Sequence, residues 1–498
     1  MGMAAMDMAA TVSRPKIKHP AFAWLVLLAF PASGYAGDWR FTPSVNVSER
    51  FTDNVKLVST AEESSFITEV APGFALTKKG SRADVSVNYN LQGLLYSHDS
   101  DAGDLHNQLA ARARFELVED RFFLDANASV AQQNTNSITG PTNPGGSNYN
   151  LTGNSSETRS LSITPSFVHR FASTAQLDAR WQLNYSGSDN GTVSDTNGSN
   201  FNLGLKSGAA FQRISWALNH GVQYSDGANS TRTSSTSATA GYAPTAKTRF
   251  NLTVGADDNN RGNVGSFKQA SGTYWNIGAS WSPTSRTKLD ATAGHRYSGA
   301  SYGLNFSHKT RNTNWTLRYS EDISDIYSQL NGTAAFDVYN CSGVPYVIPA
   351  GSLPPNPTCV LAPFPIYLPT TSLINDTSLN RTWSGGLSWQ LSKSTITANL
   401  SRSQREQLAT GIEDTNQSLS GAWNWRINSR MTSNLGLAFT QADNGAADSD
   451  TYSLTWSLSR KLSAKATGSI ELRHYVGDTS ASGRYTENSA AARLNLSF

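Results

Sequence analysis

Most of the chain alternates between apolar and polar residues with a period of two. The pattern recurs along the sequence, for example in residues 85–91, 177–185, 214–218, 250–254 and 464–472. Successive side chains of a β-strand point to opposite faces of its sheet, so each of these segments has one apolar and one polar face. No stretch shows the period of an amphipathic helix. The pattern therefore predicts an all-β chain.

The expected strands are long, and the connections between them alternate between short and long. Strand segments of about 12 to 16 residues exceed the five or six that are usual in globular sheets. Short turns are expected at 78–81, 119–120, 172–174, 244–246, 283–285, 392–393 and 428–429, and longer polar loops at 134–156, 188–197, 259–267 and 327–374. Alternation alone also fits a sandwich, a propeller or a β-solenoid. Short periplasmic turns opposite long external loops, however, are typical of membrane barrels.

Tryptophans gather beside the expected short turns. They are Trp216, Trp281, Trp315, Trp389, Trp425 and Trp456. Indole rings favour the boundary between lipid and water. The cluster predicts an aromatic girdle at the periplasmic end of a barrel.

The last segment has the pattern of a final barrel strand. Leu494, Leu496 and Phe498 alternate with polar residues up to the carboxyl terminus. A terminal strand that ends in phenylalanine resembles the signal that outer-membrane assembly machinery reads. Because no strand edge can stay unpaired in lipid, we expect this strand to pair with the first one, near residues 39–50.

The whole pattern predicts a closed antiparallel transmembrane β-barrel of about 22 strands, with 20 to 24 as the range that a miscounted hairpin allows. With strands about 4.8 Å apart and tilted by about 40°, such a ring is roughly 40 Å across. Side chains cannot fill a ring of that size, so we expect some part of the chain to occupy or narrow it.

The amino terminus has the features of a cleavable secretory signal. Arg14, Lys16 and Lys18 precede an apolar run that ends near Phe30, and small residues lead up to Gly37. The alternative is a retained anchor helix, but the run has roughly half the length that a membrane span requires. We expect residues 1–36 to be removed and residues 37–498 to form the barrel in the outer membrane of a Gram-negative cell.

Composition excludes some classes of partner. Charged residues make up 15% of the chain, and its formal net charge is +3. Removal of residues 1–36 takes away three basic residues and one acidic residue, which lowers the net charge to about +1. A nucleic-acid partner would require a basic face. We therefore expect no nucleic acid among the partners, which should instead include outer-membrane lipid and the assembly machinery.

One loop differs from the others. Residues 328–373 are rich in proline and hold the only two cysteines, Cys341 and Cys359. In an oxidising compartment these cysteines are expected to form a disulfide. A loop of this length is usually functional or disordered. One hypothesis is that it constricts the lumen, and the alternative is an external loop that packs on its neighbours.

The polar faces of the strands identify the residues expected to line the lumen. The charged members are Arg112, Arg114, Glu116, Asp125, Asp178, Arg180, Asp290, Arg296, Arg318, Glu471 and Arg473. Together with many amides and hydroxyls they suit a hydrated passage for hydroxyl-rich solutes, which need many weak donors and acceptors. The alternative is that arginine–carboxylate ladders only brace the wall.

The sequence gives little support for catalysis. Its few histidines cannot be assigned a nucleophile and an orienting partner. It has no glycine-rich phosphate loop, no metal-ligand spacing and no haem-attachment motif. We expect no enzyme activity, no catalytic or metal-binding residues and no cofactor.

The first third of the chain contains a series of specific motifs. They are Trp39-Arg40-Phe41-Thr42-Pro43-Ser44, Glu49-Arg50-Phe51-Thr52-Asp53-Asn54-Val55, Phe66-Ile67-Thr68-Glu69-Val70-Ala71-Pro72-Gly73, His106-Asn107-Gln108-Leu109, Glu116-Leu117-Val118-Glu119-Asp120, Phe123-Leu124-Asp125-Ala126 and Gln132-Gln133-Asn134. Over residues 37–135 the chain resembles the outer-membrane proteins associated with the exosortase/PEP-CTERM system, a family found in exopolysaccharide gene regions. The family has no established catalytic residues, so none are carried over.

The resemblance implies a role in exopolysaccharide export or in the surface system that accompanies it. The leading hypothesis is a passive or gated conduit for an exported polymer, with periplasmic export proteins as further partners. A structural barrel that docks a periplasmic or surface partner is the alternative. A barrel that insulates electron carriers fits the size but has no other support.

Overall fold

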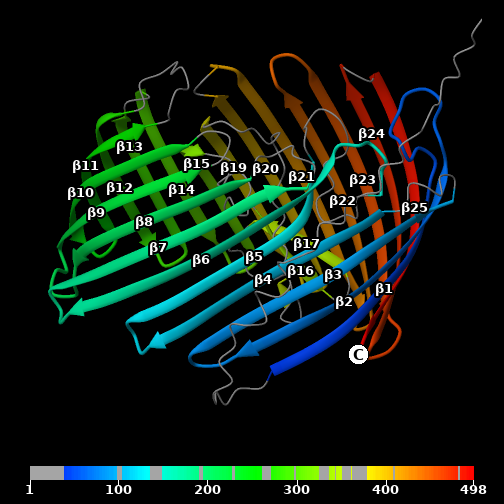
Figure 1. The fold of residues 1–498 in the computed structure, drawn as a ribbon, viewed down its shortest axis with the longest axis horizontal. Coiled ribbons are helices and arrows are strands. Elements are labelled where there is room, and N and C mark those ends of the chain that lie inside the picture. Colours follow the sequence, from blue (N-terminus) through cyan, green and yellow to red (C-terminus); the bar gives the residue numbers. More distant parts are fainter. Residues whose placement is uncertain are drawn as a thin grey trace, which may run out of the picture. The chain divides into compact units, whose positions relative to one another are not determined.

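The structure is a computed structural model that contains one closed antiparallel β-barrel (Figure 1). The chain divides into Met1–Asp38 and Trp39–Phe498, and the second unit forms the barrel. The described residues are 39–97, 104–134, 149–189, 195–226, 230–260, 271–296, 299–324, 336–341, 344–349, 360–361, 378–407, 410–480 and 483–498. The expected signal peptide, residues 1–36, lies outside them.

Twenty-two strands form the barrel. They are β1 (Trp39–Thr52), β2 (Ser65–Lys79), β3 (Ala83–Tyr96), β4 (Asp104–Val118), β5 (Phe122–Asn134), β6 (Ser155–Phe171), β7 (Ala175–Ser188), β8 (Thr196–Ser207), β9 (Ile214–Asp226), β10 (Thr231–Thr245), β11 (Thr248–Asn260), β12 (Gly272–Thr284), β13 (Thr287–Arg296), β14 (Gly299–Lys309), β15 (Thr313–Ser324), β19 (Ser378–Gln390), β20 (Ser394–Gln407), β21 (Glu413–Asn428), β22 (Met431–Asp443), β23 (Asp448–Lys461), β24 (Ala466–Thr479) and β25 (Gly483–Ser497).

The ring closes between its first and last strands. β25 pairs with β1 in an antiparallel register that runs from Ser44 opposite Ser497 to Thr52 opposite Ser489. The backbone N–H of Phe498 also donates to the carbonyl oxygen of Pro43, at 2.9 Å. No strand of the ring has a free edge, and the prediction of a closed antiparallel barrel of about 22 strands is confirmed. Within the described residues, no helix has the length and apolarity needed to cross a membrane.

The two faces of each strand differ in the way that the alternation predicts. In β1, Phe41 is 60% exposed on one face, whereas Arg50 and Thr52 on the other face are 4% and 0% exposed. Residues directly opposite one another in a sheet point to the same side of it. The strand register therefore assigns an exposed and a buried face to every strand of the ring. Exposed large apolar side chains such as Leu252 and Ile277 continue the first face. A continuous apolar band of this kind indicates contact with lipid.

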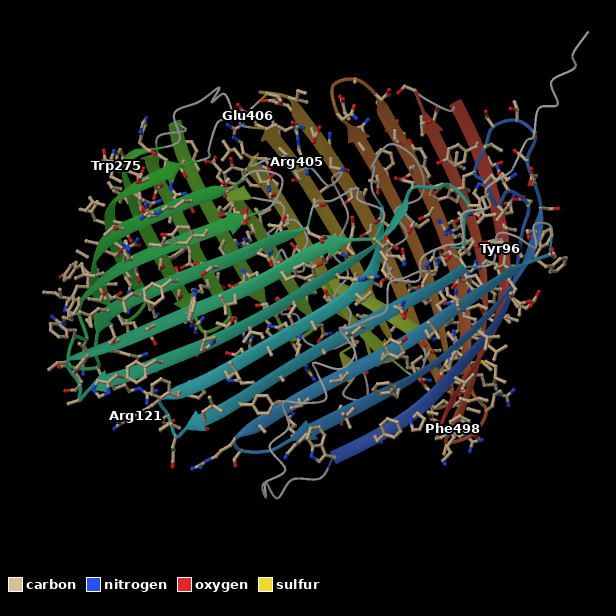
Figure 2. The ribbon with its side chains drawn as sticks, viewed as in Figure 1. Tyr96, Arg121, Trp275, Arg405, Glu406 and Phe498 are labelled. Atoms are coloured by element: carbon tan, nitrogen blue, oxygen red, sulfur yellow. The ribbon has the colours of Figure 1, made fainter. Side chains whose placement is uncertain are left out.

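The two ends of the barrel differ in their connections. At the short-turn end, strands are joined by turns such as 246–247, 285–286 and 429–430. At the long-loop end, the connections include 53–64, 135–154 and 325–377. Arg405 and Glu406 mark the long-loop end at the top of Figure 2, and Arg121 and Phe498 mark the opposite end. The predicted arrangement, with short turns at one end and the longest loops at the other, is confirmed, although the connections 297–298 and 480–482 at the long-loop end are short.

The predicted tryptophan girdle follows the short-turn end. Trp281, Trp315, Trp389 and Trp425 are exposed on the apolar face. Trp216 and Trp456 lie on the same face and are half-buried. Tight turns also shape this end, where Asp120 and Ala172 adopt positive φ angles of 55° and 48°.

The proline-rich segment 328–373 contains short strands that the sequence pattern did not predict. β16 (Phe336–Cys341) pairs with β17 (Val344–Pro349) and β18 (Val360–Leu361). Their β-branched and aromatic residues favour this pairing, and the small sheet has no ladder to the barrel strands. Cys359 lies outside the described residues, so the disulfide and the constriction stay predictions.

Candidate functional site

Tyr149 identifies the lumen side of the sheet. Its phenolic oxygen accepts a hydrogen bond from Arg473 on β24 at 2.8 Å, and the Arg50 guanidinium on β1 lies 4.1 Å from its ring centre. Its backbone carbonyl accepts a hydrogen bond from the Tyr96 hydroxyl on β3 at 3.0 Å. A residue outside the sheet can reach β24, β1 and β3 together only from the concave side. The face that holds Arg50 and Arg473 is therefore the inner face.

The register then places the predicted lumen residues. Arg50 and Glu471 both lie opposite Ala491, and Arg114 lies opposite Asp125, at a distance of 3.9 Å between Nε and Oδ1. Followed from strand to strand, the pairing puts all of the charged residues named from the sequence on the inner face: Arg112, Arg114, Glu116, Asp125, Asp178, Arg180, Asp290, Arg296, Arg318, Glu471 and Arg473.

Five charged residues at the seam form a group with Tyr149, which we call the seam cluster: Arg50, Glu471, Arg473, Glu487 and Arg493, together with Tyr149. The Glu471 carboxylate accepts from Arg50 at 2.8 Å and forms an ion pair with Arg493 at 3.3 Å. Glu487 is fully buried and accepts from Thr52 at 2.8 Å. These bonds join β24, β25 and β1 where the ring closes. Buried charges need such partners, and within the described residues the Oε2 atom of Glu487 is the one carboxylate oxygen of the cluster that is buried without a hydrogen bond.

Two loop segments pack on the lumen side of the first strands. The backbone N–H of Leu151 donates to the carbonyl oxygen of Val55 at 2.9 Å. Val55 and Tyr149 form a buried apolar cluster with Ile67, Leu94 and Tyr96, against which Leu151 packs. Ile67 and Leu94 are apolar residues on a mostly polar inner face, and this cover explains why they are found there.

The sequence did not predict the seam cluster as a unit. Glu471 and Arg473 were identified as lumen residues, but Tyr149 belongs to the predicted loop 134–156, where no alternation assigns a direction to a side chain. Arg50 and Glu487 were also missed. Their parity on the first and last strands is the signal that could have identified them, since it places both side chains on the inner face.

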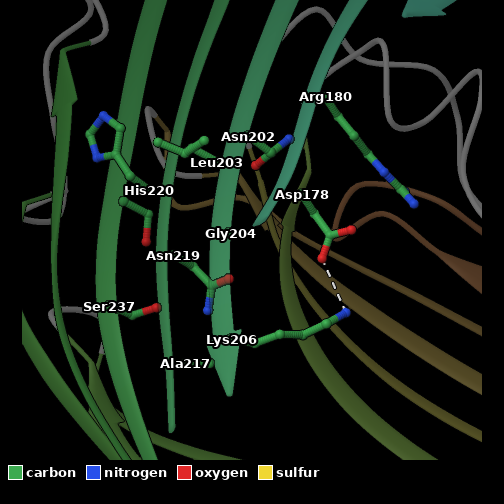
Figure 3. A pocket seen from close by; sticks show the side chains of 12 residues that line it. Asp178, Arg180, Asn202, Leu203, Gly204, Lys206, Ala217, Asn219, His220 and Ser237 are labelled. Carbon is green, nitrogen blue, oxygen red and sulfur yellow. Dashed lines mark ion pairs between the residues drawn. The ribbon is translucent and has the colours of Figure 1, made fainter. Parts of the chain in front are cut away.

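A hollow of about 350 Å³ opens on the inner face of β7–β10, near the short-turn end (Figure 3). Asp178 forms an ion pair with Lys206 at 3.1 Å and accepts from the Gln176 amide at 2.9 Å. The exposed guanidinium of Arg180 makes no ion pair with a carboxylate of the described residues. The hollow therefore presents a cation whose hydrogen-bonding capacity is available to a ligand.

The inner face of β20 and β21 carries uncharged polar residues. Thr397, Asn399 and Ser401 follow one another on β20 and are buried. Ser401 and Ser418 share a hydrogen bond of 2.7 Å across the two strands. Nearer the long-loop end, Arg405 donates to Asp414. Because the β20 side chains are buried, their hydroxyl and amide groups belong to the packing of the wall and are not open to the lumen.

The described part of the chain shows no group of three or more His, Cys, Asp or Glu side chains that could hold a metal ion. His220 and His295 lie on the outer face, where His220 shares a hydrogen bond of 2.8 Å with Thr236. The expectation that the protein is not an enzyme stays a prediction.

Comparison with known proteins gives structural neighbours alone. No protein-family model and no curated protein matches the chain. The siderophore receptor PirA from Acinetobacter baumannii is similar in structure, with a TM-score of 0.50 and 10% identity over 94% of this chain and 81% of the receptor. The FrpB iron transporter from Neisseria meningitidis is similar with a TM-score of 0.50 and 9% identity, over 93% and 82%. The chain thus has the fold of outer-membrane β-barrel proteins.

Proposed function

We propose that the protein is an outer-membrane conduit, passive or gated, for an exported exopolysaccharide. The observation that carries the proposal is the chemistry of the lumen wall on β8 to β10, where the exposed amides of Asn202 and Asn219 lie beside the hydroxyls of Ser235 and Ser237 on the inner face. A sugar polymer presents many hydroxyl groups, each of which exchanges a weak hydrogen bond with such a wall. No single strong contact then holds the polymer in place.

The size of the ring supports this role. A barrel of 22 strands is too wide for its own side chains to fill. The similar structures belong to a siderophore receptor and an iron transporter. Movement of a solute through the lumen is therefore a function that this fold supports, although the fold alone does not select the solute.

The nature of the polymer comes from the sequence resemblance. The motifs in residues 37–135 are similar to those of the PEP-CTERM-associated outer-membrane proteins, which are found in exopolysaccharide gene regions. In this proposal the protein performs no chemistry on the polymer, which periplasmic export proteins deliver to the barrel.

Two measurements test the conduit. Purified protein inserted into a planar bilayer should give discrete conductance steps. Deletion of its gene in the native host should trap polysaccharide in the periplasm, and a plasmid copy should restore surface polysaccharide. A protein that inserts without conductance, together with normal surface polysaccharide in the deletion strain, would overturn the proposal.

The seam cluster favours a second candidate function. Tyr149 and the residues beside it cover the inner face of five adjacent strands, from β24 through β25 and β1 to β3. A barrel narrowed in this way also suits a structural role, in which it docks a periplasmic or surface partner and conducts nothing. In that case the barrel would retain a partner on affinity purification but give no conductance.

A further inference from the structure

We propose that the hollow on the inner face of β7–β10 is a binding site for an acidic sugar unit, whose carboxylate is held by Arg180. This inference deepens the proposed conduit function, because it names the chemical class of the polymer. Its test is designed so that failure of the site and failure of the conduit give different results.

The charges of the hollow favour an anionic ligand. Arg180 and Lys206 contribute two positive charges and Asp178 one negative charge, which leaves a net charge of +1. Asp178 is already engaged, since Lys206 and Gln176 both contact its carboxylate. Arg180 is exposed on the inner face, and Figure 3 shows its side chain extending from the wall on the side of Asp178, with no ion pair to that carboxylate. A guanidinium presents a planar fork that matches a carboxylate with two parallel hydrogen bonds.

The amides of the hollow suit the hydroxyl groups of a sugar. Asn202 and Asn219 lie on β8 and β9, each directly opposite a glycine of the other strand. The Asn202 amide also donates to Asn200 Oδ1 at 2.8 Å, which fixes its orientation. An asparagine side chain offers both donors and an acceptor. The site therefore combines one charged anchor with neutral polar groups, as sugar recognition requires.

Two glycines make room for these amides. A Cβ atom on Gly221 would come within 2.8 Å of Asn202 Oδ1, and one on Gly204 within 3.1 Å of Asn219 Oδ1. Because neither glycine has a Cβ atom, both asparagines can lie across the strand opposite them. The volume of about 350 Å³ falls within the range of small-molecule sites.

The position of the hollow fits an exported polymer. Asp178 and Arg180 follow the short turn 172–174, and Lys206 precedes the connection 208–213 at the same end. Short turns face the periplasm in barrels of this kind. A polymer that leaves the cell would meet this cationic hollow as it enters the barrel, which would concentrate an acidic chain at the entrance.

The experiment compares an acidic with a neutral oligosaccharide. Hexagalacturonate or maltohexaose is added to the side of the short turns while the ionic current through a single wild-type, Arg180→Gln or Arg318→Gln barrel is recorded. Arg318 is the matched control, because it is an exposed inner-face arginine that makes no ion pair with a described carboxylate and lies on β15, outside the hollow. The same sugars are titrated calorimetrically into the detergent-solubilised proteins.

We expect hexagalacturonate to block the wild-type current at a concentration at least tenfold below that of maltohexaose. Arg180→Gln should raise the half-blocking concentration about tenfold, since it removes a charge-assisted hydrogen-bond pair, while Arg318→Gln should change it less than twofold. Gly221→Ala, which displaces Asn202, should also weaken the block.

Three results would overturn the site. Equal increases in the half-blocking concentration of hexagalacturonate for Arg180→Gln and Arg318→Gln would show a general effect of lumen charge. An equal block by maltohexaose would exclude an acidic ligand. Calorimetric binding that is absent, or that does not depend on Arg180, would exclude the hollow. Absence of wild-type conductance would overturn the conduit alone, because calorimetry would still decide whether the hollow binds the acidic sugar.

Discussion

Arg473 donates a hydrogen bond of 2.8 Å to the phenolic oxygen of Tyr149, a residue 324 positions earlier in the chain. The bond ties a loop segment that follows β5 to the inner wall of β24. Both side chains are buried, with exposed fractions of 7% and 2%. The segment is therefore held against the inner wall by this bond to β24 and by the contacts of Tyr149 with β1 and β3.

We predict that Tyr149→Phe loosens this segment. The phenyl ring keeps its place over Arg50, but a buried N–H group of Arg473 loses its acceptor, at a cost of about 1–3 kcal/mol. Single-channel recordings should then show more frequent current fluctuations, and larger conductance steps, than the wild-type barrel.

The control is Tyr452→Phe, which removes a hydroxyl from the outer face, where the side chain is 51% exposed. Its current traces should match those of the wild type. If Tyr149→Phe also matches the wild type, Tyr149 does not restrict the lumen.

A second prediction concerns the closure of the ring. Glu471→Gln removes the only described carboxylate that forms an ion pair with Arg50 or Arg493. Loss of one partner of a buried ion pair lowers the free energy of unfolding by about 3–5 kcal/mol. Because the Glu471 side chain is 20% exposed, we expect a value at the lower end of this range. The temperature at which the barrel unfolds in detergent, read from its mobility on a gel, should fall by several degrees.

Glu119→Gln provides the comparison for Glu471. Glu119 forms an ion pair with Arg82 at 3.0 Å at the short-turn end, with a side chain that is 77% exposed. A surface pair of this kind contributes about 0–1 kcal/mol. Equal melting temperatures for the two variants would show that the seam cluster does not stabilise the closure.

The barrel could be predicted from the sequence because the alternation of apolar and polar residues can be read within each strand by itself. One face of each strand meets lipid and the other meets the lumen, so the alternation alone assigns residues such as Leu252 and Thr253 to opposite faces. The strand count followed from turns that interrupt this alternation. The pairing of β25 with β1 followed from the requirement that no edge remains unpaired in lipid.

The seam cluster could not be predicted because its geometry is not local. Tyr149 lies in a loop, and a loop carries no periodicity from which its contacts with Arg50 and Arg473 could be derived. The hollow on β7–β10 was found in part, since parity identified Asp178 and Arg180. The Asn202–Gly221 relationship was missed because it depends on the register between two strands, which shows which asparagine lies opposite which glycine.

A third prediction tests the assignment of faces on one strand. Val254 is 50% exposed on the outer face of β11, and the adjacent Thr253 faces the lumen, where it shares a hydrogen bond of 2.9 Å with Thr239. Val254→Arg places a charge in lipid, at a cost of about 2–4 kcal/mol near the middle of the membrane. Thr253→Arg places the same charge in water.

Folding of both variants into lipid vesicles can be followed by urea titration. We expect Val254→Arg to lower the urea midpoint clearly and Thr253→Arg to lower it little. The opposite order would mean that the faces are reversed, and the assignment of the hollow and the seam cluster to the lumen would then be wrong.

A fourth prediction concerns the last residue. Phe498 is 60% exposed on the outer face at the short-turn end, and its backbone N–H bonds to Pro43. Its side chain is therefore accessible on the face where assembly machinery would bind, and its backbone helps to complete the β25–β1 pairing. Removal of Phe498 should reduce the amount of protein in the outer membrane several-fold and increase its degradation in the periplasm.

Phe498→Ala separates these two contributions, because it keeps the backbone hydrogen bond to Pro43 and removes the ring alone. If the ring is the assembly signal, this variant should be as poorly inserted in cells as the deletion, yet it should fold into lipid vesicles at the wild-type rate when no machinery is present. Normal insertion of Phe498→Ala in cells would assign the effect of the deletion to the lost backbone contact and would refute the terminal phenylalanine as a sorting signal.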